Sequence, residues 1–207
     1  MLKNHLKKTY WLAVIVSVIT IIVYYSSVNN DFIRNWDDNL YIIDNELIQD
    51  DTPGQIKRIF TEYWMGHYHP ITILIYLAEY KIFGDQPEYY HLFNLFLHLI
   101  NCILVFYLVF AFFKNKTAAF LISLIFAVHP MHVESVAWIS SMKDLLYGMF
   151  FLISLIFYLK YINDKKVSLL LFTFILFILS VLSKSAAIIL PLILFLTDYF
   201  FERKFTV

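Results

Sequence analysis

Six apolar stretches, each about long enough to cross a lipid bilayer, dominate this sequence of 207 residues. They are Tyr10–Val28, His91–Phe113, Thr117–Val133, Leu145–Ile162, Val167–Ser183 and Ser185–Phe201. A transmembrane helix needs about 20 mostly apolar residues, and about 17 are tolerated. Hydrophobic residues make up 60% of the chain and charged residues 15%, against about 45–50% and about 25% in soluble domains. We therefore expect an all-α fold, a polytopic bundle of about six transmembrane helices, and we exclude intrinsic disorder and a soluble globular enzyme.

The first stretch, Tyr10–Val28, could also be a secretory signal peptide. Its apolar core is longer than the ~7–15 residues of a signal peptide, and no A-x-A-like cleavage site follows it. We interpret it as an uncleaved membrane anchor. The single cysteine, Cys102, excludes a disulfide scaffold, and the formal net charge of zero gives no reason to expect a nucleic-acid partner.

Charged residues divide unevenly between the two sides of the six predicted spans. If the N-terminus is cytoplasmic, ten of the sixteen basic residues lie on the cytoplasmic side, together with three acidic residues. The other side then receives six basic and thirteen acidic residues. Cytoplasmic loops of membrane proteins are enriched in Lys and Arg. We therefore expect an integral, multi-pass membrane protein with both termini in the cytoplasm and the other side external, that is, periplasmic, extracellular or lumenal.

A further apolar stretch, His69–Phe83, is only 15 residues long and carries Glu79 and Lys81. As a helix it reaches about 22 Å, less than the ~30 Å of the hydrocarbon core. We expect an interfacial amphipathic helix within one long external region, Asn29–Tyr90. The face turned toward lipid or the protein core is expected to contain Ile71, Leu74, Ile75, Ala78 and Ile82. Residues 1–207 are expected to form a single membrane domain with no soluble domain.

Titratable side chains from separate stretches gather on the predicted external side. Asp37 and Asp38 lie in the first external loop, Lys143 opens the fourth span, and Lys184 lies in the last hairpin. Polar groups near the membrane are costly and are often functional. The two carboxylates could form a solvated turn or a functional group whose pKa is tuned by its surroundings. Lys184 could extend to the lipid headgroups or, since it breaks the positive-inside pattern, bind an anion.

The run His129-Pro130-Met131-His132-Val133-Glu134 ends the third span on the same side. His residues three positions apart share a helical face, which favours a metal site. However, Pro130 is expected to end the helix, and no further ligand is near. A polar loop that lines a pocket is the main interpretation, and a metal site is the alternative.

A polar stripe runs along the second span. His91, Asn94, His98 and Asn101 are offset by 0, 3, 7 and 10 positions, which places them on one helical face. These side chains could form hydrogen bonds between helices. Alternatively, they could line a cavity that opens to the external side.

Several of these motifs resemble one family of membrane enzymes. The sequence is similar to the C-type (GT-C) polytopic glycosyltransferases that use lipid-linked sugars, and most of all to the transmembrane tetratricopeptide-repeat O-mannosyltransferases and their bacterial relatives. The similarity runs from about Phe32 to Tyr199, and the H-P-M-H-V-E-S-V-A-W run beginning at His129 is its most specific part. The other matching pieces are Asn35–Asp38, Tyr68–Thr72, Phe83–Gly84, Tyr90–Asn94, His98 with Asn101, Ser183–Lys184, Leu190–Pro191 and Asp198–Tyr199.

Two departures from the family pattern stand out. Members of the family often have Arg where this chain has His69. The family also continues with further spans and then tetratricopeptide repeats, which are missing here. The resemblance therefore implies the N-terminal portion of a GT-C-like module, which a downstream chain would complete as a partner.

The resemblance implies transfer of a sugar, mannose in the family, from a polyprenyl-phosphate donor to a hydroxyl group of a protein or glycan acceptor on the external face. By position, Asp37 is the expected general base of an inverting reaction, and Asp38 orients it or shares its role. The expected donor-phosphate and substrate-binding residues are Lys184, Lys143, His132, His129, Glu134, His69 and His91. No cofactor is required by the resemblance, and a divalent metal is left open.

The alternative to an enzyme is a membrane protein in which these residues catalyse no reaction. A catalytically inactive or partial relative could act as a membrane scaffold or as a transporter subunit. Transporters favour helices broken by Gly or Pro at mid-bilayer, and the four glycines avoid the centres of the predicted spans.

For the enzyme, the expected partners are a polyprenyl-phosphate-linked sugar, its acceptor and membrane lipid, and no nucleic acid.

Overall fold

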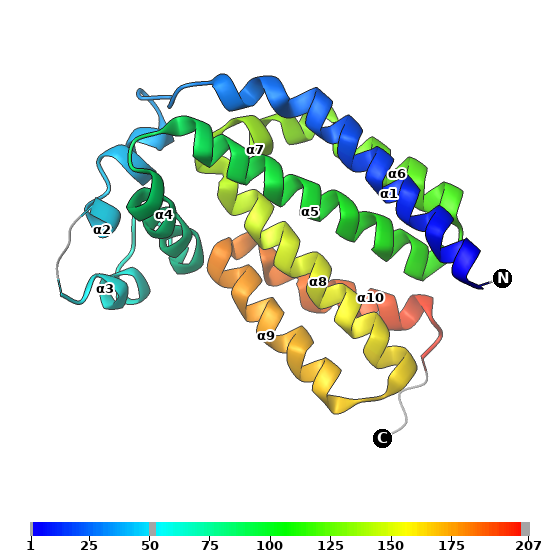
Figure 1. The fold of residues 1–207 in the computed structure, drawn as a ribbon. Coiled ribbons are helices and arrows are strands. Elements are labelled where there is room, and N and C mark those ends of the chain that lie inside the picture. The colour runs from blue at the N-terminus through cyan, green and yellow to red at the C-terminus, as the bar shows by residue number, and fades with distance from the viewer. Residues whose placement is uncertain (1, 50–52, 204–207) are drawn as a thin grey trace.

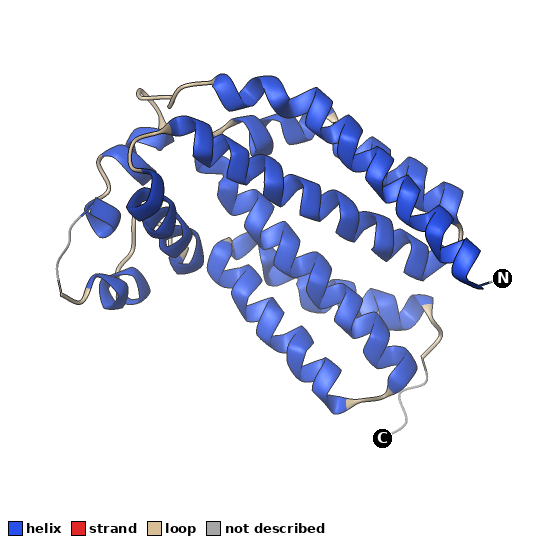
Figure 2. Ribbon diagram, viewed as in Figure 1, coloured by secondary structure: helices blue, strands red, loops and turns tan. Residues whose placement is uncertain are grey.

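The computed structural model of the protein describes residues 2–49 and 53–203. Within these residues the chain is helical and contains no β-strand, as Figure 2 shows. The α-helices are α1 (Leu2–Tyr24), α2 (Glu46–Gln49), α3 (Gln55–Thr61), α4 (Pro70–Phe83), α5 (Pro87–Phe113), α6 (Lys116–Val128), α7 (Val133–Ala137), α8 (Met142–Asp164), α9 (Val167–Ser183) and α10 (Leu190–Phe200). Shorter helical turns are η1 (Tyr25–Asn29), η2 (Asn39–Ile43), η3 (Pro130–His132), η4 (Ile139–Ser141) and η5 (Ser185–Ile189). The expected all-α fold is confirmed.

The long helices α1, α5, α6, α8 and α9 run along the length of the molecule, and α2, α3 and α4 gather at one end (Figure 1). We call α2–α4, together with residues 31–45 before them, the cap. The chain reverses direction between successive long helices, so that α8 begins and α9 ends at the cap end (Figure 1). The start of α1 and the end of α10 lie away from the cap.

Two helical hairpins, α5–α6 and α8–α9, form the centre of the bundle. Both first helices end on a lysine in the left-handed conformation, Lys114 with φ 52° and Lys165 with φ 56°. Asn115 then caps α6, because its side-chain oxygen accepts hydrogen bonds from two backbone N–H groups at 2.9 and 3.1 Å. In both hairpins a short polar turn therefore joins the two helices, and the second helix packs directly against the first.

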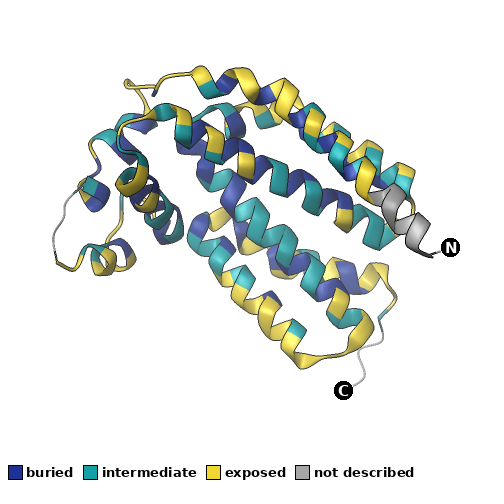
Figure 3. Cartoon of the chain, viewed as in Figure 1, coloured by how far each residue is buried: buried dark blue, intermediate teal, exposed yellow. Residues whose placement is uncertain are grey.

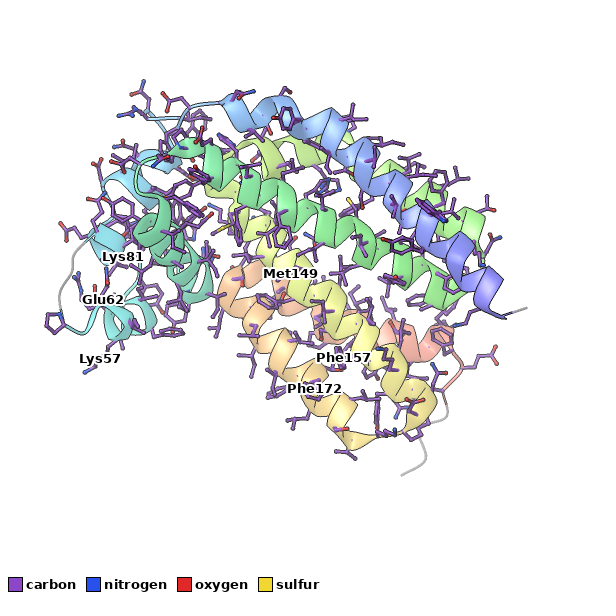
Figure 4. The ribbon with its side chains drawn as sticks, viewed as in Figure 1. Lys57, Glu62, Lys81, Met149, Phe157 and Phe172 are labelled. Carbon is purple, nitrogen blue, oxygen red and sulfur yellow. The ribbon has the colours of Figure 1, made fainter. Side chains whose placement is uncertain are left out.

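Small polar side chains hold the α8–α9 hairpin together. Ser154 donates a 2.9 Å hydrogen bond to the carbonyl oxygen of Thr173, and Ser180 donates one of 2.7 Å to that of Tyr147. Closer to the turn that joins the two helices, the rings of Phe157 and Phe172, labelled in Figure 4, pack with centroids 5.4 Å apart. Close helix packing with interhelical hydrogen bonds is typical of helices in membranes.

Within the described residues, three helices are long and apolar enough to cross a membrane: Tyr10–Asn29, Pro87–Phe113 and Ile139–Asp164. They coincide with the first, second and fourth predicted spans. The third predicted span is broken, because the helix stops before Pro130 and resumes at an angle of 51°. Counted as one span, this bent pair would raise the total to four.

The last two predicted spans form shorter apolar helices, Val167–Ser183 and Ser185–Phe200. At 1.5 Å per residue, α9 is about 26 Å long, slightly less than the ~30 Å hydrocarbon core. The fold is therefore that of an all-α membrane protein. The count of six crossings stays a prediction.

The cap has a hydrophobic core of its own. Tyr41, Ile48 and Tyr76 are almost completely buried there and belong to one cluster with Tyr90 of α5 and Met142 of α8. The region between the first two spans is therefore folded onto the end of the bundle.

Helix α4 starts one residue later than predicted, and its 14 residues are about 21 Å long. Its buried face is formed by Thr72, Ile73, Tyr76, Leu77 and Glu79. On the predicted stripe, by contrast, Ile71, Leu74 and Ile75 are half-buried, and Ala78 and Ile82 are exposed. Leu74 and Ile75 pack against the hydrophobic core, so the stripe divides between the core and the outer side of the helix, where Ala78 and Ile82 can meet lipid.

Apolar side chains also cover the outside of the bundle. Ile22 of α1 is 71% exposed, Ile125 of α6 is 61% exposed and Leu171 of α9 is 60% exposed. Figure 3 shows such exposed positions along the outward sides of α1 and α9. A soluble monomer rarely exposes contiguous apolar patches larger than a few hundred Å². Contact with lipid accounts for this surface.

Candidate functional site

Two lysine–carboxylate pairs meet at the cap end of the bundle. The ammonium of Lys143, at the start of α8, lies 3.8 Å from a carboxylate oxygen of Asp37 in the cap. The ammonium of Lys184, between α9 and η5, lies 2.5 Å from a carboxylate oxygen of Asp144. All four side chains are partly exposed. The fold thus brings three distant parts of the chain to one charged, accessible site.

Asp37 and Asp38 have different surroundings, although they are neighbours in sequence. Asp38 is 1% exposed. One carboxylate oxygen accepts hydrogen bonds from the backbone N–H of Ser140, at 2.9 Å, and from its hydroxyl group; the other accepts one from the backbone N–H of Ile33 at 2.9 Å. Asp38 therefore ties the cap to η4, and Asp37 is the carboxylate that a substrate could reach.

Asp38→Asn is expected to lower the free energy of unfolding by about 3 kcal/mol, since each hydrogen bond to a charged group contributes about 1.5–3 kcal/mol. The amide NH₂ would also face a buried N–H donor, which leaves that donor without an acceptor. Unfolding in detergent measures the loss, with Asp37→Asn as the matched control. If both variants melt like the unaltered chain, Asp38 does not hold the cap in place.

Lys143 lies between Asp37 and an aromatic ring. Its ammonium is 4.5 Å from the centre of the Tyr41 ring, an arrangement in which the ring face attracts the cation. Burial, with a smaller contribution from Asp37, raises the pKa of Tyr41 to about 12. The phenol therefore stays neutral at physiological pH, and the ring can hold the lysine beside Asp37.

Lys184 is positioned by two neighbouring helices. The carbonyl oxygen of Ser183 accepts a 2.9 Å hydrogen bond from the buried hydroxyl group of Thr72 in α4, which fixes the hairpin. The lysine ammonium lies over the ring of Tyr147, 5.9 Å from its centre, as well as beside Asp144. These contacts direct Lys184 toward the charged site, where an anion could meet it.

His69 lies beside this site but does not supply a positive charge at neutral pH. It is 8% exposed. Burial lowers the pKa of His69 to about 4, and His67, Lys143 and Lys184 contribute in the same direction. At pH 7 it is therefore a neutral imidazole.

A cavity of about 350 Å³ adjoins the charged site. It lies between α5, α8 and the segments around η3 and η5, and both Asp144 and Tyr147 line it. His132 also lines it and packs against Phe126, with ring centroids 4.3 Å apart. The prediction that part of the H-P-M-H-V-E run lines a pocket is thus met at His132.

The other residues of the predicted site lie apart from the two ion pairs. His129 and Glu134 are exposed on the outside of the bent third helix. His129 accepts a 3.2 Å hydrogen bond from the backbone N–H of Met131. His91 is 1% exposed, within the core beneath the cap. In the described parts of the chain, no group of three His, Cys, Asp or Glu side chains could hold a metal ion.

The polar stripe of α5 forms hydrogen bonds to neighbouring segments, and two of its residues also line the cavity. Asn94 donates to the carbonyl oxygen of Trp138 at 3.1 Å, and Asn101 donates to that of Leu145 at 2.9 Å. His98 lies 2.9 Å from the carbonyl oxygen of Ala127. Of these carbonyls, that of Ala127 lies in the last turn of α6, where helix carbonyls lack a partner within the helix. His98 and Asn101 also line the cavity.

Two contributors to the site, Asp144 and Tyr147, were not among the predicted site residues. Asp144 directly follows Lys143 in sequence. An acidic side chain in the first turn of a helix is common, because it interacts favourably with the helix dipole. Only the approach of α9 gives it Lys184 as a partner. A tyrosine near a membrane surface is equally common and carries no specific signal.

Comparisons with known proteins give relatives but no structural match. A protein O-mannosyl-transferase of Caenorhabditis elegans is 31% identical over 204 residues, which cover 90% of this chain and 28% of that protein. The human protein O-mannosyl-transferase TMTC3 is 30% identical over 159 residues, covering 72% of this chain and 17% of that protein. Human TMTC4 is 28% identical over 179 residues, covering 76% and 24%. No protein-family model and no solved structure matches the chain.

Proposed function

Because its curated homologues are protein O-mannosyltransferases of the TMTC type, we propose that this chain forms part of a membrane glycosyltransferase. The chain spans about a sixth to somewhat over a quarter of the length of those relatives. The reaction proposed is transfer of a sugar, mannose by similarity, from a polyprenyl-phosphate donor to a hydroxyl group of a protein or glycan. The observation that carries the proposal is an accessible carboxylate, Asp37, 3.8 Å from Lys143 beside a second lysine.

In this proposal Asp37 acts as the general base. It takes the proton of the acceptor hydroxyl while the hydroxyl oxygen forms a bond to the anomeric carbon of the sugar. The bond between that carbon and the phosphate oxygen breaks, and its electron pair leaves on the phosphate. Attack from the side opposite the leaving group inverts the anomeric configuration. Lys143 would hold Asp37 in position.

Lys184 is proposed to stabilise the departing phosphate. Its ammonium has three N–H donors, of which the contact with Asp144 uses one. The remaining donors can meet phosphate oxygens, where charge grows as the bond breaks. Neutral His69, and His132 in the wall of the cavity, could add hydrogen bonds to the sugar. Binding roles for His129, Glu134 and His91 have less support, since the first two are exposed elsewhere and His91 is buried.

The active side is proposed to be external and both termini cytoplasmic. The asymmetric distribution of Lys and Arg supports this orientation. It places the cap, and with it the two ion pairs, on the external face. Asp50, Lys204 and Val207, which belong to the loops used in this orientation, lie outside the described residues.

Cysteine labelling in cells checks this topology. On a background without Cys102, a membrane-impermeant maleimide is expected to label Ser185→Cys in intact cells, and Lys165→Cys only after lysis. Reporter tags near Asp50 are expected outside, and tags after Lys116 and Val207 inside. Equal labelling of Lys165→Cys before and after lysis would contradict the orientation.

An in-vitro assay separates this function from a scaffold or transporter subunit. The purified chain in nanodiscs is given polyprenyl-phosphate mannose and a serine- and threonine-containing peptide, alone and with the protein encoded by the downstream reading frame. Mannosylated peptide in either mixture, lost with Asp37→Asn, supports the proposal. No product in either mixture, with both proteins folded, favours the inactive alternative.

A further inference from the structure

A second cavity, of about 260 Å³, lies between the ends of α5 and α8. Its walls include the apolar side chains of Phe112, Ile156 and Phe201. Three polar side chains also line it, Lys114, Lys160 and Asn163. A cavity with an apolar wall and ammonium groups has the composition needed to bind an amphipathic anion.

This cavity is remote from the candidate active site. Lys160 lies 17 residues after Lys143 on the same helix, α8, which corresponds to about 26 Å at 1.5 Å per residue. The two lysines therefore lie near opposite ends of a helix long enough to cross a membrane. The second cavity can be tested without reference to the proposed transfer reaction.

The surrounding charges favour an anion. Residues 114–116, 160–166 and 201–203 contain six basic and two acidic residues. The nearby Asp198 is 4% exposed and already occupied, because it accepts hydrogen bonds from Tyr158 at 2.6 Å and Arg203 at 3.2 Å. Its charge is thus compensated within the protein, and the positive field at this end remains.

The apolar wall is fixed by packing. The rings of Phe112 and Phe201 lie with centroids 5.4 Å apart, which closes one side of the cavity with aromatic surface. Lys160 lies over the ring of Phe157, with its ammonium 5.4 Å from the ring centre. Lys114 is held at the end of α5 in a left-handed turn, its N–H bonded to the carbonyl oxygen of Phe110 at 2.9 Å. The backbone of Lys114 and the ammonium of Lys160 are therefore each held by a contact within the protein.

We propose that this cavity binds an anionic phospholipid, with its phosphate between Lys114 and Lys160 and one acyl chain against Phe112 and Ile156. Basic pockets between transmembrane helices bind such headgroups at the cytoplasmic face, where anionic lipids are enriched. The orientation proposed above places this end of the bundle at that face. Free phosphate would gain nothing from the apolar wall, and a zwitterionic lipid would gain little from the two ammonium groups. The ligand is therefore an anionic lipid of the surrounding membrane.

Lipid binding to the whole chain in detergent tests the proposal. Native mass spectrometry counts adducts during titration with phosphatidylglycerol and, separately, with phosphatidylcholine. The double variant Lys114→Gln/Lys160→Gln is expected to bind phosphatidylglycerol about 30-fold more weakly, since each lysine near a lipid headgroup contributes about fivefold. The matched control Lys165→Gln/Lys166→Gln removes the same charge outside the cavity and should have a much smaller effect.

A second variant separates a lipid site from a phosphate site. Ala111→Phe fills the cavity but leaves both lysines in place. It should weaken phosphatidylglycerol binding and leave unchanged the extent to which inorganic phosphate competes with that binding. Equal affinity for the two lipids overturns the proposal. So does an equal loss in both lysine double variants, or full competition by millimolar inorganic phosphate.

Discussion

Asp37→Asn is expected to lower the rate of sugar transfer by about 10²–10⁴-fold, the usual contribution of a general base. The asparagine side chain has nearly the same size but cannot take the proton of the acceptor hydroxyl. Because Asp37 is partly exposed and its recorded ionic contact is a 3.8 Å pair with Lys143, the folded protein should melt at an unchanged temperature. Single-turnover transfer rates, measured with the donor at saturation, give the effect directly.

Controls distinguish loss of a base from loss of structure. Asp37→Glu keeps a carboxylate and should recover part of the rate. Asp85→Asn removes an exposed carboxylate between α4 and α5 that belongs to neither ion pair, and it should leave the rate near its original value. Full turnover by Asp37→Asn, or a large fall in its melting temperature, would show that Asp37 is not the base.

Lys184→Gln is expected to weaken use of the polyprenyl-phosphate donor by about 10- to 100-fold. This range follows from about 1.5–3 kcal/mol for a charge-assisted contact and about 1.4 kcal/mol per tenfold change. Lys184→Arg should retain part of the affinity, because it keeps the charge and changes the geometry. The measurement is the dependence of the transfer rate on donor concentration, for all three proteins in the same nanodiscs.

Asp144 offers a control for this experiment. Asp144→Asn removes the partner of Lys184 but keeps the ammonium, so the donor affinity should be retained or improved. A lysine that only extended to lipid headgroups would give the same apparent donor affinity in the unaltered chain and in the Gln and Arg variants. In that case the phosphate would have to be held elsewhere, with Lys143 as the remaining lysine of the site.

The sequence predicted α5, α8 and α9 well because polar residues flank their apolar cores. The predicted span Val167–Ser183 coincides with α9, which lies between Lys166 and Lys184. Pro130 likewise indicated where the third apolar helix would stop, since proline removes a backbone donor and clashes with the preceding turn. The bend of 51° that follows depends on packing around the break and could not be derived from composition.

The structure of the cap was harder to predict from the sequence. Hydrophobic periodicity locates an apolar face, but in a membrane protein lipid and protein core attract the same residues. For α4 the predicted stripe is only partly buried, and the residues buried most deeply are Ile73 and Tyr76, which lie outside it. Neither the short helices α2 and α3 nor their shared core had a periodic signal long enough to detect.

Apolar length and charge distribution are local properties, so the α-helical membrane class of this chain could be derived from its sequence alone. Which polar residues meet depends on the tertiary structure. Asp37 and Asp38 are identical in type and adjacent, yet Asp38 is bound by Ser140, 102 residues away, and Asp37 is left beside Lys143. Lys184 gains Asp144 in the same way. Such pairings depend on where distant helices end in space, and no local pattern encodes that distance.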